Sequence, residues 1–264
     1  MGHPQGLDTT DMDSVRTDED AVTLNAEQVQ HYHEHGYLQI DALTSADEVE
    51  QLQGIYDRLF ETGADVDDRD RIELAGDKDG PPALPQILNP DHYAPELLET
   101  VAYRNAQRVA RSLLGDEVRP TGMHAIRKPP RDGAETPWHQ DEAYWSPAVE
   151  HRALSIWMPL QPATLDNGCM QFVPGSHALE VQPHRLINPD SHGLVATDPA
   201  AGESPVACPL PPGGATVHTS RTMHYAGPNR TDEPRRALIM SFACDAVPLD
   251  VPREFPWQRP EWSA

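Results

Sequence analysis

Residues 153–173, ALSIWMPLQPATLDNGCMQFV, decide the fold class of this chain. They hold two β-prone runs, 153–160 and 169–173, and the connection between the runs is rich in turn-forming residues. Short apolar runs separated by Pro, Asn and Gly are typical of strands joined by tight connections. The same texture continues on both sides, with further β-prone runs at 117–127, 193–197, 214–219 and 236–244. We therefore expect an all-β double sheet or barrel after Gly115.

The segment before this β-rich region predicts helices. Asn25 is a suitable N-cap for a helix over 26–35, and Gly36 would end that helix in the left-handed conformation. Residues 37–40 then alternate like a strand.

Two more helices follow. Ser45 and Glu48 form a capping-box pattern that opens a helix with apolar residues at helical spacing, and a third helix is predicted over 95–114. Residues 61–83 are charged and rich in Gly and Pro, so they are expected to form an exposed loop that covers a site. The predicted fold class is mainly β, with helices flanking a jelly-roll core.

The domain organisation is predicted from length and composition. Residues 1–22 are polar and acidic without helical or strand periodicity, which indicates a disordered tail. Residues 23–264 are expected to form a single domain, since β-sandwiches and barrels reach this length. No repeat of 20–50 residues and no Gly-rich fingerprint after a strand is present, which disfavours solenoids and dinucleotide-binding folds.

Charge and cysteine content limit the partners and the compartment. The formal net charge is -22, so the molecule should repel nucleic acids and anionic membrane surfaces. The cysteines are odd in number and lack a C-x-x-C pair, which supports neither a disulfide framework nor a zinc knuckle. No signal-peptide pattern and no long apolar stretch occurs, so we expect a cytoplasmic protein.

The most informative motif is PWHQDEAYW at residues 137–145. In an extended strand, His139 and Asp141 point to the same face and can reach one metal ion. His224 follows later in the chain, just before another β-prone run, and is a candidate third ligand. Two histidines and a carboxylate on one face leave iron(II) open positions for a chelating cosubstrate and dioxygen, although zinc hydrolysis could use the same ligands. Arg235 opens the next strand, and its planar guanidinium suits a cosubstrate carboxylate.

At this point the sequence resembles the phytanoyl-CoA dioxygenase (PhyH-like) family of 2-oxoglutarate-dependent oxygenases. The resemblance runs from Leu24 to Cys244 through four blocks, LNAEQVQHYHEHGYLQI, IRKPPRDGAETPWHQDEAYW, ALSIWMPLQPATLDNGCMQFVPGSH and MHYAGPNRTDEPRRALIMSF. It implies a double-stranded β-helix (jelly-roll, cupin-like) with His139, Asp141 and His224 as the Fe(II) ligands. It also implies that Arg235 pairs with the far carboxylate of 2-oxoglutarate.

The resemblance implies further cosubstrate-binding residues. Trp157 matches a position where the family places an indole against 2-oxoglutarate, and the alternative is an ordinary core aromatic. His124 falls at a cosubstrate-lining position whose identity varies in the family, and Gln86 matches a further polar contact more loosely.

Other residues near the motifs have competing interpretations. His218 could replace His224 as third ligand, but it resembles a position inside the preceding strand. His177 is better explained as a hydrogen-bonded loop histidine.

Glu142, Tyr144 and Trp145 follow the first ligands and are candidates for lining the substrate side of the pocket, although core packing explains the two rings equally well. The acidic run 65–70 lacks the ligand spacing of a calcium loop and is expected to be solvated.

The implied reaction couples oxidative decarboxylation of 2-oxoglutarate, with O2, to hydrogen abstraction from a small-molecule substrate, and it releases succinate and CO2. Hydroxylation is the default outcome, and desaturation, cyclisation and epimerisation follow from the same abstraction. Halogenation is disfavoured because Asp141 occupies the position that a halide would need. A non-catalytic metal-binding β-barrel is the alternative of a different class. The acidic balance disfavours a coenzyme A thioester as substrate, so a neutral or cationic metabolite is expected.

Overall fold

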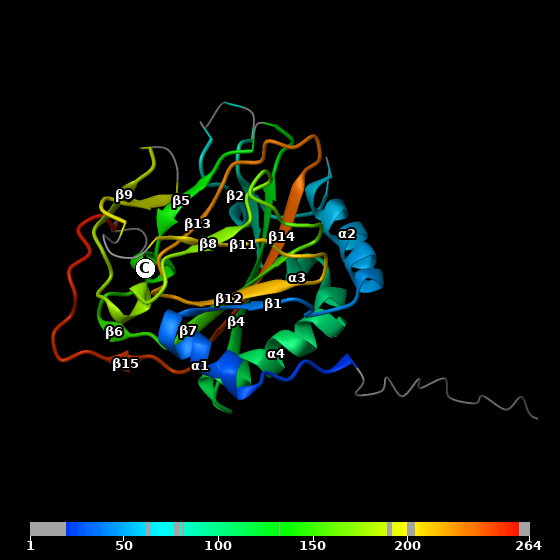
Figure 1. The fold of residues 1–264 in the computed structure, drawn as a ribbon. Helices are drawn as coiled ribbons and strands as arrows, with labels where there is room; N and C mark the ends of the chain where they lie inside the picture. The colour runs from blue at the N-terminus through cyan, green and yellow to red at the C-terminus, as the bar shows by residue number, and fades with distance from the viewer. Residues whose placement is uncertain are drawn as a thin grey trace, which may run out of the picture.

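Two β-sheets form the centre of the molecule (Figure 1). The computed structural model describes residues 20–61, 64–76, 80, 82–131, 133–188, 192–199 and 204–258. The larger sheet has seven strands in the order β1 (Tyr37–Ile40), β12 (Ala215–Thr219), β7 (Ala153–Pro159), β14 (Arg235–Ala243), β4 (Arg119–Lys128), β3 (Pro85–Leu88) and β2 (Arg71–Glu73). The smaller sheet has four, in the order β11 (Val206–Cys208), β8 (Met170–Phe172), β13 (His224–Ala226) and β5 (Thr136–His139).

Two further antiparallel pairs lie beside these sheets, β9 (His184–Leu186) with β10 (Leu194–Ala196) and β6 (Val149–Glu150) with β15 (Val247–Pro248). The helices are α1 (Ala26–His35), α2 (Ala46–Phe60), α3 (Pro90–Tyr93) and α4 (Val101–Leu114). Short 3-10 helices are η2 (Asp68–Asp70), η3 (Pro95–Glu99), η4 (Asp141–Tyr144) and η5 (Ser176–Ala178). The expected mainly β jelly-roll core with flanking helices is confirmed.

Strand alternation in β7 separates the two largest buried apolar clusters. In β7, Leu154, Ile156 and Met158 pack in one buried cluster with apolar residues of α2 and α4. Trp157 points the other way and shares a second cluster with Phe172 of the smaller sheet. Successive residues of a strand face opposite sides of its sheet, so one face of β7 is covered by helices while the other looks toward the smaller sheet. The functional site lies on this inner face.

The first predicted helix is confirmed at both ends. The Asn25 side chain accepts a hydrogen bond from the Gln28 backbone, and the Gln28 side chain accepts one from the Asn25 backbone. Gly36 ends α1 with a φ of 80°, where a side chain would be strained. The predicted strand at 37–40 is β1, which pairs with β12 at the edge of the larger sheet.

The capping box predicted for the second helix is only half formed. Ser45 accepts from the Glu48 backbone at 3.2 Å. The Glu48 carboxylate instead accepts from the backbone N–H groups of Val101 and Ala102, at 2.7 and 2.8 Å. Glu48 therefore caps α4, because the first N–H groups of a helix need acceptors and an anion there is favoured.

The predicted third helix was wrong at its start. Residues 95–99 form η3, and α4 begins only at Val101 after Thr100. The Thr100 side chain accepts a hydrogen bond from the Tyr103 backbone and so ends the first segment and caps the second.

The predicted loop 61–83 contains β2, which is three residues long and pairs with β3. A strand this short has too few residues to show alternation in the sequence. Residues 62–63, 77–79 and 81 of this loop, and residues 1–19 of the predicted tail, lie outside the described residues. Among the helices of the described ranges, none has the length and apolarity needed to cross a membrane.

Candidate active site

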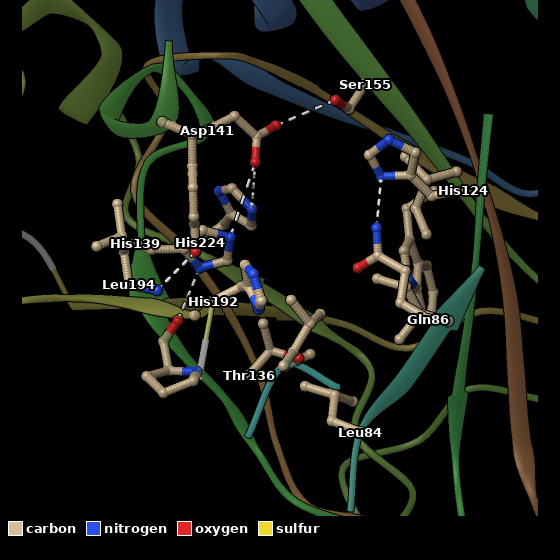
Figure 2. A pocket seen from close by; sticks show the side chains of 18 of the residues that line it. Leu84, Gln86, His124, Thr136, His139, Asp141, Ser155, His192, Leu194 and His224 are labelled. Atoms are coloured by element: carbon tan, nitrogen blue, oxygen red, sulfur yellow. Dashed lines mark hydrogen bonds and ion pairs between the residues drawn. The ribbon is translucent and has the colours of Figure 1, made fainter. Parts of the chain in front are cut away.

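Three side chains from two neighbouring strands and the turn after one of them form a group that can hold a metal ion. His139 ends β5 and faces His224 of β13 directly across the antiparallel ladder. Asp141 follows at the start of η4. The ligating atoms of these three residues lie within 4.8 Å of one another, and no other His, Cys, Asp or Glu group of this kind occurs among the described residues. Figure 2 shows the three side chains pointing toward one another at one side of a pocket.

Both histidines are oriented by backbone carbonyls. Nδ1 of His139 lies 2.8 Å from the Pro137 carbonyl oxygen, and Nδ1 of His224 lies 2.8 Å from that of Thr222. A carbonyl oxygen only accepts, so each Nδ1 carries the hydrogen and each Nε2 keeps its lone pair. Burial lowers the pKa of His139 and lowers that of His224 well below its usual value. A metal ion binds the neutral form of imidazole through a nitrogen lone pair. In both histidines this lone pair is on Nε2, the nitrogen nearer to the Asp141 carboxylate.

Asp141 does not lie in a strand, in contrast to the expectation from the sequence. The strand ends at His139, and Asp141 begins a 3-10 helix. Gln140 between them is nevertheless extended, with φ -122° and ψ 131°, so the same-face relation of His139 and Asp141 is retained. The Gln140 side chain points elsewhere and donates to the Arg221 carbonyl at 2.7 Å.

The Asp141 carboxylate has partners on both of its oxygens. Oδ1 lies 3.5 Å from Nε2 of His224, and Oδ2 accepts from the Ser155 hydroxyl at 3.1 Å. Oδ2 also lies 3.4 Å from Nε2 of His218, which is in β12 and buried. Burial raises the pKa of Asp141. The neighbouring histidines and the hydrogen bond from His218 lower this pKa by a larger amount, so the net pKa is below its usual value. His218 thus contacts the carboxylate and is not part of the group that could hold a metal.

Arg235 is a buried cation without a protein partner for part of its guanidinium. The side chain is 1% exposed, and its Nε and Nη1 have no hydrogen-bond acceptor among the described residues. The guanidinium lies over the Trp157 ring, 5.4 Å from the ring centroid. Burial lowers the pKa of Arg235 to about 10. Buried donors of this kind are normally satisfied, so the side chain is suited to an anion that enters the cavity.

Arg236, the next residue, lies on the opposite face of β14. Its Nε and Nη2 bind the Asp57 carboxylate of α2 at 2.7 and 2.8 Å. The register of β14 therefore directs Arg235 into the cavity and Arg236 toward the helices, as alternation along a strand requires.

Gln86 and His124 form a polar pair on the wall formed by β3 and β4. The Gln86 side-chain nitrogen lies 3.0 Å from Nδ1 of His124. Because the amide nitrogen donates, Nδ1 is the acceptor and Nε2 of His124 carries the hydrogen. Burial lowers the pKa of His124. Figure 2 shows this pair across the pocket from Asp141 and His139.

The three metal-ligand candidates line one cavity of about 450 Å³ together with Arg235, Trp157, Gln86 and His124. Of the residues expected to contact substrate, Tyr144 and Trp145 line it, and the Tyr144 hydroxyl accepts from the Leu194 backbone at 2.6 Å. Glu142 does not line it. Its carboxylate is buried in ion pairs with Arg221 and Arg253, each at 2.8 Å, so the expected substrate contact does not fit its position.

The remaining motifs are structural. Nε2 of His177 lies 3.1 Å from the His33 carbonyl, as expected for a loop histidine. In the acidic run, Asp67 pairs with Arg69 and Asp70 accepts from Tyr93.

Several cavity residues were not predicted individually from the sequence. Ser155 could have been found, because it lies two residues before Trp157 and must share its face. Others come from short strands and turns without a readable pattern, and they include Ile72, Leu74, Leu84, Leu88, Thr136, Ile187, His192, Gly193 and Leu194. Ile72 and Leu74 lie in the segment 61–83, which was expected to cover a site.

Comparison with known proteins agrees with this geometry. The chain is 31% identical over 244 residues to a probable alpha-ketoglutarate-dependent hypophosphite dioxygenase of Stutzerimonas stutzeri, with 85% of this chain and 80% of that protein covered. The crystal structure of EvdO2 from Micromonospora carbonacea var. aurantiaca superimposes with a TM-score of 0.79 at 40% identity, over 90% of this chain and 98% of that one. A second structure of EvdO2 contains 2-oxoglutarate, with a TM-score of 0.78 at 38% identity and the same coverage of 90% and 98%.

The non-heme alpha ketoglutarate dependent carbocyclase SnoK from nogalamycin biosynthesis is more distant, with a TM-score of 0.69 at 25% identity over 86% of this chain and 87% of that one. Residues 32–237 match the family described as phytanoyl-CoA dioxygenase (PhyH). This chain therefore belongs to the phytanoyl-CoA dioxygenase family and is a 2-oxoglutarate-dependent non-haem iron oxygenase.

Proposed function

We propose that the protein oxidises a C–H bond of a small organic molecule, with His139, Asp141 and His224 holding Fe(II) and Arg235 binding 2-oxoglutarate. The observation that carries the proposal is the Arg235 guanidinium, buried and partly unpartnered in the same cavity as the three metal-ligand candidates. Neither a zinc hydrolase nor a metal-binding barrel without activity requires a buried, partly unpaired cation beside the metal. A 2-oxoglutarate oxygenase needs this cation for the far carboxylate of its cosubstrate.

The donor set fits the metal. Two neutral imidazoles and one carboxylate are the ligands that non-haem Fe(II) takes in oxygenases of this kind. Bound iron and 2-oxoglutarate supply the oxidising chemistry, in which cosubstrate decarboxylation with O2 is coupled to hydrogen abstraction and gives succinate and CO2. Trp157 supports the Arg235 guanidinium from one side. Gln86 holds His124 in the form whose Nε2 carries the hydrogen, so His124 would be a donor to a cosubstrate in the cavity.

The protein's own contribution is orientation and exclusion of water. Ser155 and His218 hold the Asp141 carboxylate from the side away from His139, which limits its rotation. The aliphatic and aromatic residues around the cavity keep water from the reacting bond.

Hydroxylation is the default outcome, and the retained Asp141 disfavours halogenation. Oxidative ring closure is a second candidate, favoured by the similarity over 86% of this chain to the carbocyclase SnoK. The two outcomes differ in product mass, since hydroxylation adds one oxygen atom and ring closure removes two hydrogen atoms.

The test is a metabolite library incubated with enzyme, Fe(II), ascorbate and 2-oxoglutarate, with succinate and product masses measured together. We expect succinate formation that requires Fe(II) and a substrate that gains oxygen. Succinate formation that is absent with iron, or metal-dependent hydrolysis without 2-oxoglutarate, would contradict the proposal.

We also propose that the protein is located in the cytoplasm. The three cysteines are free thiols, two of them buried. A reducing cytoplasm keeps thiols in this state. Fractionation of cells that produce the protein from its own gene would test the location.

A further inference from the structure

Two short strand pairs form the outer walls of the active-site cavity. On one side, Ile72, Leu74 and Leu84 come from β2, β3 and the residues that continue them, and the Leu74 N–H donates to the Leu84 carbonyl at 3.2 Å. On the other side, Leu194 comes from β10 and Ile187 directly follows β9, which pairs with β10. Figure 2 shows Leu84, Thr136, His192 and Leu194 around the part of the pocket away from Ser155.

The two strand pairs approach each other closely at Gly193. A Cβ atom added to Gly193 would lie 2.6 Å from the Leu74 carbonyl oxygen and would also overlap the Ile187 side chain. Such a distance to backbone is too short for any side chain, so only glycine allows this approach. The contact holds the apolar wall of β2–β3 against that of β9–β10.

The proposed function assigns the Arg and the carboxylate of the cavity lining to the cosubstrate and the iron. Of the described residues that line it, Arg235 is the only Lys or Arg and Asp141 the only carboxylate. Under the proposed function, Arg235 would neutralise the far carboxylate of 2-oxoglutarate, and the charge of Asp141 and of the near carboxylate would balance that of Fe(II). A charged group on the substrate would therefore be buried without a partner, which is costly. The polar side chains that remain on the outer part include Thr136, Tyr144 and the exposed His192.

We propose that the cavity selects an uncharged organic substrate whose apolar face lies between the β2–β3 wall and the β9–β10 wall. The inference rests on the proposed function, because that function assigns Arg235 and Asp141 to the cosubstrate and the iron. It narrows the sequence-based expectation of a neutral or cationic metabolite to a neutral one. It also distinguishes the described part of this cavity from a site for a small inorganic anion, which would need a second Lys or Arg in its lining.

The selectivity can be measured with three probes that share a naphthalene ring and differ in charge. The holoenzyme with Fe(II) and 2-oxoglutarate, under nitrogen, is titrated calorimetrically with 2-naphthylmethanol, naphthalene-2-sulfonate and 2-naphthylmethylammonium. We expect the neutral alcohol to bind at least about tenfold more tightly than either ion. Equal or tighter binding of the sulfonate or the ammonium ion would overturn the proposal.

A charge placed on the wall should reverse the preference. Leu74 is half-buried, so Leu74→Arg can be accommodated, and it should raise sulfonate affinity about tenfold while it lowers that of the alcohol. Leu165→Arg is the matched control, because Leu165 is 57% exposed and lies outside the cavity lining, and it should change neither affinity. Unchanged sulfonate binding in Leu74→Arg would overturn the placement of the wall.

Gly193→Ala should weaken alcohol binding by about tenfold, because the added methyl group forces the two walls apart.

Succinate formed from 2-oxoglutarate without any probe separates failure of this inference from failure of the proposed function. Iron-dependent succinate release with no preference for the neutral probe would overturn only the inference about the walls. A clear preference for the alcohol in a protein that releases no succinate would support the walls and count against the proposed function.

Discussion

Two adjacent arginines on β14 have opposite environments, and this gives a direct test of the cosubstrate site. Arg235 is buried with unpartnered donors in the cavity, whereas Arg236 is paired with Asp57. We predict that Arg235→Ala raises the KM for 2-oxoglutarate by about tenfold to several hundredfold, since a charged hydrogen bond contributes roughly 1.5–3 kcal/mol and its loss leaves a carboxylate unpaired. Arg235→Lys should restore only part of the affinity, because an ammonium group lacks the planar fork.

Arg236→Ala is the matched control and should leave that KM nearly unchanged. Steady-state succinate assays on the three variants measure it. A large rise in KM for Arg236→Ala with none for Arg235→Ala would contradict the cosubstrate site.

The histidines around Asp141 differ in a way that metal binding can detect. We predict that His139→Ala and His224→Ala each lower Fe(II) affinity by more than the roughly 10–100-fold that loss of an outer hydrogen-bond partner costs. His218→Ala removes only such an outer partner of Asp141 and should stay within that range. Anaerobic iron titration checks the order. If His218→Ala lost more affinity than His224→Ala, the third ligand would be His218.

At the scale of elements, η4 is held from outside by the chain near residue 253. Glu142 on η4 is 1% exposed and pairs with both Arg221 and Arg253.

The Trp257 indole and the Gln258 amide both donate to the Ala143 carbonyl at 3.0 Å. These contacts fix the short helix that begins with Asp141, so the segment after β15 acts on the metal site through η4.

We predict that Glu142→Ala lowers the free energy of unfolding by about 3 kcal/mol, because removing one member of a buried ion pair leaves its partners uncompensated. It should also weaken Fe(II) binding, since η4 carries Asp141. Arg119→Ala breaks the exposed pair with Asp245, whose side chains are 63% and 90% exposed, and should change stability by no more than about 0.5 kcal/mol. Urea unfolding and iron titration of both variants measure the two effects. Equal, small effects would show that the ion pairs do not support η4.

At the scale of the whole molecule, the metal would connect β5, β13 and η4, while the cosubstrate would reach Arg235 on the other sheet. We predict that Fe(II) at about a hundredfold above its Kd stabilises the protein by about 2.7 kcal/mol, which corresponds to a rise in Tm of about 5–10 °C. A chelator should reverse the rise. His139→Ala should show no such response in scanning calorimetry, and a full metal-induced rise in that variant would place the ion elsewhere.

The accuracy of the sequence-based predictions depended on the range of the interactions involved. Asn25 and Gly36 bound α1 through contacts within a few residues, and both ends were predicted. Glu48 was assigned to its own helix by a local pattern, but its carboxylate caps α4, more than fifty residues away. The acceptor that a helix end uses is decided by which carboxylate packs nearest, and a sequence pattern cannot express this.

The sequence alone determined the β-rich core and the motif around His139. It also determines that Arg235 and Arg236, as neighbours in one strand, face opposite sides, because alternation along a strand is a local property. Only the tertiary structure decided that Glu142 faces Arg221 and Arg253 instead of the cavity, and that Ser155 and His218 hold Asp141. The same holds for the apolar walls, which come from strands too short to show a period and meet at Gly193. Local periodicity states which side of a strand a residue faces, whereas the packing of distant segments decides what it meets there.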